Sequence, residues 1–179
     1  MLEEKKKEVI LVDSMGCRTG RMEKILAHKR GELHSAYSIF IYNQYDELLL
    51  QKRAVDKYHS SGLWSNSCCS HPEPDDKRSI REMAEERLLY EMGIKSDLTL
   101  KQTFCYKQNV DHGLIEYEYD YIFIGKSDNT PILNNLEVSD FKWKKISDII
   151  HDVRLYPANY TMWFKTILEN QVDISINYP

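Results

Sequence analysis

The chain has 179 residues, of which 42% are apolar and 29% charged, and its formal net charge is −4. These values are typical of one globular domain with a core large enough to need no disulfide staples. The acidic balance argues against a broad nucleic-acid-binding surface, and no apolar run approaches the roughly 20 residues that cross a bilayer. We therefore expect neither a nucleic-acid partner nor a membrane partner.

The N-terminal segment and the cysteines both favour a cytoplasmic protein. Residues 1–8 are mostly charged, and the apolar run that follows, Val9–Val12, is too short for the core of a secretory signal. Cys68 and Cys69 are neighbours, and adjacent cysteines form a disulfide only with strain. Because four cysteines make no disulfide framework in a chain of this size, we expect reduced thiols.

The first part of the chain predicts strands separated by turn residues. β-branched and aromatic residues dominate 36–42, and an apolar run resumes at 48–52 after a polar turn, which indicates a hairpin. Shorter strands are expected at Val9–Val12 and at 62–66.

A helix should follow, with further strands and helices after it. Prolines and acidic residues over 72–76 mark its start, apolar residues then recur at helical spacing, and Gly93 suits its end. The later expected elements are strands at 98–110, 115–124 and 141–144, and helices at 146–153 and from Pro157 to about Glu169. Residues 128–135 should form a loop, and the 170–179 tail has no assignment. This order of elements predicts a mixed α/β or α+β domain.

Three histidines and two acidic residues could form a metal site. Glu116 and Glu118 alternate along a predicted strand, so their side chains share one face. With His28, His34 and His71 they could complete most of the shell of a divalent Mg, Mn or Zn ion. Taken singly, each histidine could also be an ordinary surface residue, and the two acids could simply lie on the solvent-exposed face of a strand. The other histidines are predicted to be ordinary: His59, His112 and His151.

Cys69 is a candidate reactive thiol. It lies two residues before His71, in a stretch of small polar residues ahead of a helix start. A thiol near cations, a metal or a helix N-terminus can have a lowered pKa and act as a nucleophile or as an acid–base group, whereas a buried, inert cysteine is the alternative. Cys68 would point the other way if this stretch is extended.

Several charged residues could bind a phosphorylated molecule. Arg87 and Glu91 are four apart on the predicted helix, so they form either a surface ion pair or a phosphate-binding arginine beside a metal-binding acid. Lys24, Arg53 and Lys57 lie near predicted strands and could converge on a phosphate or remain solvated charges.

Together these pieces resemble the type I isopentenyl diphosphate isomerases, a branch of the Nudix-fold superfamily. The resemblance runs from about Lys24 to Trp163. The residues that carry it are His28, His34, the block Trp64–Pro72, Tyr90–Gly93, Phe104–Tyr106, Glu116–Glu118 and Trp163. It implies a Nudix-like α/β/α sandwich in one domain, residues 1–179. It also implies interconversion of isopentenyl and dimethylallyl diphosphate by proton addition and removal through a tertiary carbocation, in isoprenoid precursor biosynthesis.

The resemblance also implies a role for each matching residue. The ligands of a divalent metal (Mn, Zn or Mg) would be His28, His34, His71, Glu116 and Glu118. Glu91 would hold a Mg²⁺ ion together with the substrate diphosphate. The catalytic residues would be Cys69 and Glu118, which move protons, with Tyr106 and Trp163 as aromatic supports. The diphosphate contacts would be Lys24, Arg53, Lys57 and Arg87.

The chain departs from the Nudix hydrolase signature. With Gly93 aligned, Glu91 is in place, but Tyr90 stands where that signature has a glutamate and Glu86-Arg87 replaces Arg-Glu. Hydrolysis of a diphosphate linkage usually needs several carboxylates around Mg²⁺, so this loss favours the isomerase branch. A hydrolase of nucleoside-diphosphate-linked compounds and a non-catalytic, metal-stabilised binding domain remain the alternatives.

Overall fold

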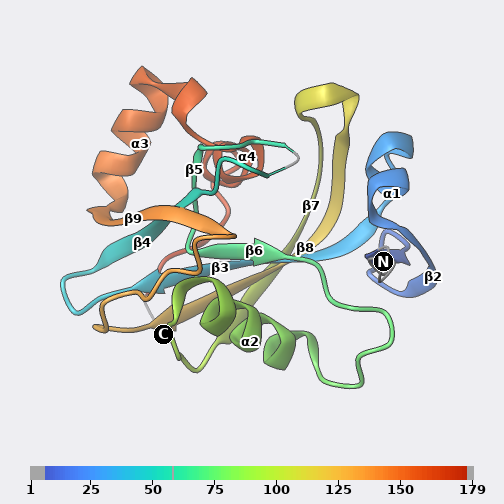
Figure 1. The fold of residues 1–179 in the computed structure, drawn as a ribbon, viewed down its shortest axis with the longest axis horizontal. Coiled ribbons are helices and arrows are strands. Elements are labelled where there is room, and N and C mark those ends of the chain that lie inside the picture. Colours follow the sequence, from blue (N-terminus) through green and yellow to red (C-terminus); the bar gives the residue numbers. More distant parts are fainter. Residues whose placement is uncertain (1–6, 58, 177–179) are drawn as a thin grey trace.

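A curled mixed sheet organises the part of the chain that the computed structural model describes, residues 7–57 and 59–176 (Figure 1). Its strands are β1 (Glu8–Val12), β2 (Arg18–Glu23), β3 (His34–Tyr42), β4 (Glu47–Arg53), β5 (Trp64–Ser65), β6 (Cys68–Ser70), β7 (Thr99–Asn109), β8 (Ile115–Lys126) and β9 (Val138–Lys145). The helices are α1 (Lys24–Arg30), α2 (Ile80–Met92), α3 (Ile146–Leu155) and α4 (Met162–Glu169), and short 3₁₀ turns cover Asp111–Gly113 and Pro157–Asn159. Within the described residues, no helix is long and apolar enough to span a bilayer.

Strand β3 lies between the two strands that carry the candidate proton-transfer residues. It pairs in parallel with β8, where His34 is opposite Glu118. It pairs antiparallel with β6, where Ser38 is opposite Cys69. The acidic strand and the cysteine strand are therefore held on opposite sides of one buried strand.

Alternation along β3 sorts side chains between two cores, one on each face of the sheet. Phe40 and Tyr42 belong to the cluster under α3 and α4, whereas Ile39 and Ile41 belong to the cluster under α2. Full burial of such a side chain contributes roughly 1.5–3 kcal/mol. Helices thus cover both faces, and the expected α/β/α sandwich in a single domain is confirmed (Figure 1).

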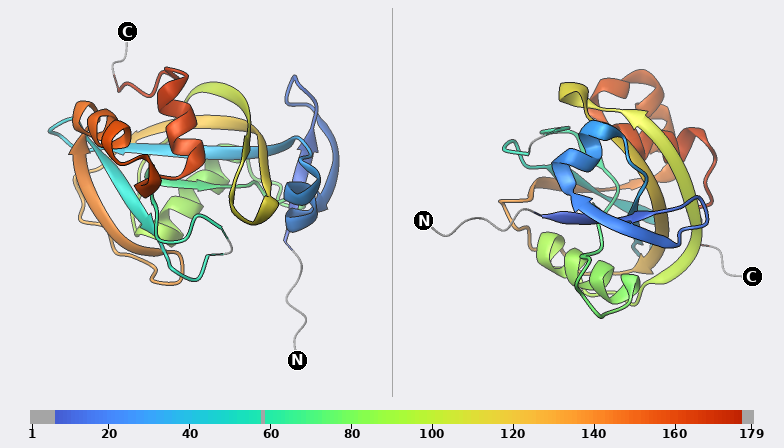
Figure 2. Two further views of the ribbon diagram at one scale, coloured as in Figure 1. Left: turned by 90° about the horizontal axis from the view of Figure 1, so that it is seen from above. Right: turned by 90° about the vertical axis from the view of Figure 1, so that its right-hand side faces the viewer.

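Figure 2 shows the hairpin of β1 and β2, together with α1, gathered at one end of the sheet, away from α3. Neither β2 nor α1 was predicted. Helix α1 is short, and its start depends on Glu23, whose carboxylate accepts hydrogen bonds from the backbone N–H groups of Ile25 and Leu26. It ends at Gly31, which has a left-handed φ of 64°.

Other predicted boundaries shift by a few residues. The hairpin of β3 and β4 is present, with Tyr42 opposite Leu48. The last helix begins at Met162 instead of Pro157, because residues 157–159 form a 3₁₀ turn and Tyr160 bridges to Trp64 in the sheet. Residues 1–6, on which part of the targeting expectation rests, and 177–179 of the unassigned tail lie outside the described residues, as does residue 58.

The residue that ends α2 has to be glycine, and this requirement can be tested. Gly93 has a φ of +66°, and a Cβ there would lie 2.7 Å from the Ile132 Cβ and 2.8 Å from the Ile132 carbonyl oxygen. Gly93→Ala should therefore lower the free energy of unfolding by about 2 kcal/mol or more, through both backbone strain and overlap. Gly113→Ala is the control, because Gly113 has a φ of +69° but open space around its Cβ position. Equal losses in urea denaturation would contradict the packing argument.

Candidate active site

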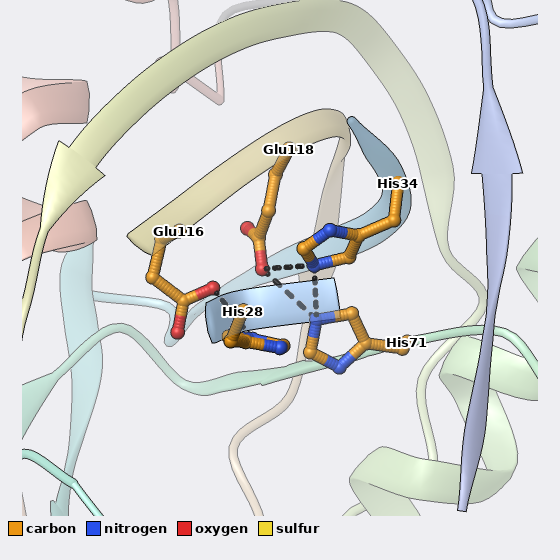
Figure 3. A group of neighbouring side chains, drawn as sticks. All are labelled: His28, His34, His71, Glu116 and Glu118. Atoms are coloured by element: carbon orange, nitrogen blue, oxygen red, sulfur yellow. Dashed lines mark hydrogen bonds and ion pairs between the residues drawn. The ribbon is translucent and has the colours of Figure 1, made fainter. Parts of the chain in front are cut away.

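Five buried or nearly buried side chains converge at one end of β8 (Figure 3). Their ligand atoms all lie within 4.8 Å of one another. They come from four parts of the chain: His28 from α1, His34 from the start of β3, His71 from the segment after β6, and Glu116 and Glu118 from β8. These are the five residues for which the sequence predicted a metal site, and the structure brings all of them together.

Backbone carbonyls fix which ring nitrogens of two histidines face the cluster. His28 Nδ1 donates to the Lys24 carbonyl at 2.6 Å, and His34 Nδ1 donates to the Glu32 carbonyl at 2.8 Å. Because a carbonyl oxygen can only accept, Nδ1 of each ring carries a proton and Nε2 is the ring nitrogen that faces the cluster. This arrangement, with the outer nitrogen bonded to a carbonyl, is the usual one for histidines that bind metals.

Ring nitrogens and a carboxyl oxygen face one another at short distances inside the cluster. His34 Nε2 lies 3.2 Å from His71 Nε2, and His71 Nε2 lies 3.0 Å from Glu118 Oε1. Burial lowers the pKa of His34 to about 4 and that of His71 well below its usual value, so these rings are neutral near pH 7. Facing nitrogens and carboxylate oxygens of this kind fit a divalent cation such as Mn, Zn or Mg.

The two carboxyl groups of the cluster are driven to opposite protonation states. Burial, and next to it the charge of Glu116, raises the pKa of Glu118 well above its usual range. Burial also opposes ionisation of Glu116, but hydrogen bonds from His28 and His59 outweigh it and hold the pKa of Glu116 well below its usual range. A pair of neighbouring acids with separated pKa values is a recurrent arrangement in acid–base catalysis.

Tyr106 lies behind Glu118. Its hydroxyl donates a hydrogen bond to Glu118 Oε2 at 2.5 Å. Burial raises the pKa of Tyr106 well above its usual value, so the phenol keeps its proton and can donate it in a hydrogen bond to the acid.

A pocket with about 530 Å³ of space, its open mouth included, lies beside the cluster. Its lining residues are Lys24, Tyr37, Arg53, Lys57, His59, Cys69, Ser70, His71, Arg87, Glu91, Glu116, Glu118 and Trp163. Burial raises the pKa of Cys69 to about 12, with the nearby Arg53 opposing it, so Cys69 is a thiol at neutral pH.

Four cations line the same pocket, as the sequence predicted for phosphate contacts: Lys24, Arg53, Lys57 and Arg87. Arg87 contacts Glu91 at 2.7 Å and Glu137 at 2.9 Å, and Lys57 pairs with the same Glu137. Gln51 donates to the other oxygen of Glu91 at 3.1 Å. Positive charge therefore gathers around two acids: the buried Glu91, which the sequence singled out, and the partly buried Glu137, which it did not.

Trp163 closes another side of the pocket. Its indole N–H donates to Ser65 Oγ at 2.9 Å, and the Arg53 guanidinium carbon lies 5.0 Å from the centre of its rings. The ring of His59 meets Trp163 edge-on at 5.6 Å between centroids. The indole is therefore fixed in orientation by a hydrogen bond and by two neighbouring side chains.

The structure differs from the sequence prediction most clearly at His59. We predicted an ordinary histidine, but its Nε2 lies 3.1 Å from Glu116 Oε1 and its ring lines the pocket. A lone histidine after a predicted strand carries no periodic signal, and only its position just before the Trp64–Pro72 block could have suggested a role. His28, His34 and Tyr106 do not line the pocket and instead contact the residues that do.

Comparisons with known proteins agree with this geometry. A family model for the NUDIX domain matches residues 32–164. The isopentenyl-diphosphate Delta-isomerase of Pectobacterium atrosepticum is 44% identical over 158 residues, covering 88% of this chain and 87% of that protein. Isopentenyl-diphosphate Delta-isomerase 2 of Aromatoleum aromaticum is 42% identical over 165 residues, covering 92% of this chain and 86% of that protein. The chain belongs to this NUDIX isomerase family.

Solved structures of more distant proteins have a similar fold. A Deinococcus radiodurans protein superposes with a TM-score of 0.73 at 12% identity, covering 91% of this chain and 98% of its own. A MutT protein of Methanosarcina mazei does so with a TM-score of 0.62 at 16% identity, covering 77% of this chain and 91% of its own. At these identities the likeness concerns the fold alone. The resemblance to the isomerase family seen in the sequence is confirmed by the relatives above.

The cluster predicts a metal-dependent gain in stability. Metal-free protein given Mn²⁺ at 100 times its dissociation constant should gain about 2.7 kcal/mol in the free energy of unfolding, because the ion binds only the folded site. A double variant, His34→Gln with His71→Gln, should gain almost nothing. Thermal denaturation with and without Mn²⁺ measures both, and an equal gain in the double variant would show that the ion binds elsewhere.

Proposed function

We propose that the chain is an isopentenyl-diphosphate Delta-isomerase that interconverts isopentenyl and dimethylallyl diphosphate. The proposal rests on one observation above all: the Cys69 thiol and the Glu118 carboxyl line the same buried pocket from strands on either side of β3. Names of relatives more than 40% identical support the same activity. The substrate is thus a small molecule, and the whole of residues 1–179 would serve as one isomerase domain.

The chemistry needs one group that gives a proton and another that takes one. Protonation of the terminal methylene of isopentenyl diphosphate leaves a tertiary carbocation, and loss of a proton from the neighbouring carbon gives dimethylallyl diphosphate. Glu118 and Cys69 can share these two tasks because they approach the pocket from different strands. In either direction, one of the two must begin the turnover without its proton so that it can take one from the substrate. In the reverse direction the two groups exchange roles, and after each turnover their protons must be redistributed.

The surroundings of Glu118 suit a general acid. Burial and the charge of Glu116 keep the carboxyl protonated, and the Tyr106 hydroxyl binds its Oε2 atom. That hydrogen bond stabilises the carboxylate that remains after the proton has left, so Tyr106 eases proton release without losing its own proton.

The aromatic wall suits a cationic intermediate. Trp163 is held by Ser65 and presents an apolar, electron-rich ring to the pocket. An indole face stabilises a desolvated cation by about 2 kcal/mol. The reaction also requires that water be kept from the cation, because water would convert it to an alcohol.

The cations and metal sites would anchor the diphosphate away from the reacting carbons. Lys24, Arg53, Lys57 and Arg87 can bind phosphate oxygens, and this binding energy orients the olefin. Glu91 would hold Mg²⁺ with the diphosphate, and the histidine–glutamate cluster would hold a second divalent ion, Mn, Zn or Mg; bound there, the ions neutralise phosphate charge and fix Glu116 and Glu118 in place.

The geometry gives the hydrolase alternative little support. Of the acids on α2, Glu91 lines the pocket, whereas Glu82 caps the helix and Glu86 pairs with Arg78. A diphosphate hydrolase would need several of these carboxylates around its metal and water. The cytoplasmic location and the absence of nucleic-acid and membrane partners stay predictions.

The proposed function has a direct test. Incubation with isopentenyl diphosphate and Mg²⁺ should produce dimethylallyl diphosphate, which is detected by its lability in acid. Phosphate release from nucleotides without isomerisation would favour the hydrolase. Inactivity in both assays, with metal bound, would favour a binding domain.

The role of Cys69 has its own test. Cys69→Ala should lower kcat by about 10² to 10⁴-fold, the range for loss of an acid–base group, and should leave the metal content unchanged. Cys68→Ala is the matched control, because Cys68 is buried in the core under α2, on the opposite face of β6. Near-normal turnover by Cys69→Ala would refute the proposed role.

A further inference from the structure

His59 lies in contact with the metal-binding cluster without being one of its five members. The side chain is 4% exposed and comes from the segment between β4 and β5. Its Nε2 lies 3.1 Å from Glu116 Oε1, while Glu116 Oε2 lies 3.1 Å from His28 Nε2. The two carboxylate oxygens of Glu116 thus have different partners, one inside the cluster and one outside it.

The hydrogen bonds of His59 suit a neutral ring that acts as a donor. A carboxylate oxygen accepts, so the proton of His59 sits on Nε2 and is donated to Glu116. Nδ1 lies 3.2 Å from the Ser60 hydroxyl, which can donate to it. Both ring nitrogens therefore have partners, and the geometry of this ring differs from that of His28 and His34, whose Nδ1 atoms donate to carbonyls and leave Nε2 for the cluster.

The backbone at the same residue holds a candidate phosphate ligand. Arg53 donates to the carbonyl oxygens of His59 and Ser60, each at 3.2 Å. Ser60 has a left-handed φ of 50°, which is unusual for serine, and its N–H donates to Asp111 Oδ2 at 2.9 Å. Residues 59 and 60 are thereby fixed at a defined place between Glu116 and Arg53.

We propose that His59 is a positioning residue: it orients Glu116 for the metal and joins the metal cluster to Arg53 through its own backbone. The inference rests on the proposed function, in which Glu116 binds a metal and Arg53 binds the diphosphate. Loss of such a hydrogen-bond partner of a metal ligand typically weakens metal binding by 10 to 100-fold.

The test compares two substitutions of similar size, His59→Gln and His59→Met. Glutamine can still donate a hydrogen bond to Glu116, whereas methionine cannot. Binding of Mn²⁺ alone, followed by the electron paramagnetic resonance signal of the free ion, should weaken about tenfold or more in the methionine variant. It should stay within about threefold of the parent protein in the glutamine variant, since the donor is retained. His151→Met, at an exposed histidine of α3, is the control and should bind Mn²⁺ normally.

A kinetic readout separates positioning from general damage to the fold. If His59 acts through the metal ligand, saturating Mn²⁺ should restore most of the kcat of His59→Met, while the Mn²⁺ concentration needed for half-maximal activity stays raised. Equal Mn²⁺ affinity in the methionine variant and the parent would overturn the inference. Equal weakening in both variants would overturn it as well, because the donor would then be irrelevant.

Failure of the proposed function is distinguishable from failure of this inference. A parent protein that binds Mn²⁺ but forms no dimethylallyl diphosphate would contradict the isomerase proposal, and the comparison of glutamine with methionine would still decide the role of His59. A parent protein that binds no Mn²⁺ would overturn both.

Discussion

The parallel pairing of β3 with β8 is the constraint on which the site depends. It sets His34 opposite Glu118 and, through the antiparallel pairing of β3 with β6, brings Cys69 to the same face. Because side chains alternate along a strand, a slip of one residue in the register of β8 would turn Glu116 and Glu118 into the core under α2. The apolar residues of β3 on both faces oppose such a slip, so the packing of the two cores also defines the chemistry.

Burial supplies much of the electrostatic character of the site. It lowers the pKa of His34 and raises the pKa values of Cys69 and Glu118, whereas hydrogen bonds from two histidines lower the pKa of Glu116. Unpaired buried charge is costly, and here cations of the pocket and donors of the cluster surround it. The pocket is therefore lined both by cations and by acid–base groups, which suits the substrate proposed above, with one anionic end and one apolar end.

Sequence patterns anticipated the strongest features of the molecule and missed those that depend on tertiary contacts. Strand β3 is rich in β-branched and aromatic residues, β8 has alternating apolar residues, and the apolar spacing of α2 is helical, so all three were predictable. The spacing of Glu116 and Glu118 fixed their common face. Helix α1 has no such signal, because it is one short helix held by the side chain of Glu23. Glu137 and His59 meet their partners only across the folded sheet, about 80 and 57 residues away along the chain from Lys57 and Glu116.

The two cysteines of β6 are neighbours in sequence but have different surroundings. Cys68 is buried among the apolar residues under α2, and Cys69 faces the pocket. A bond between their sulfur atoms would require β6 to leave β3, since both side chains would have to reach the same face. Because the pleat directs the two sulfur atoms to opposite faces, oxidation of Cys69 cannot end in a disulfide with Cys68 while β6 stays paired with β3. Reversal of such an oxidation would need a thiol from another molecule.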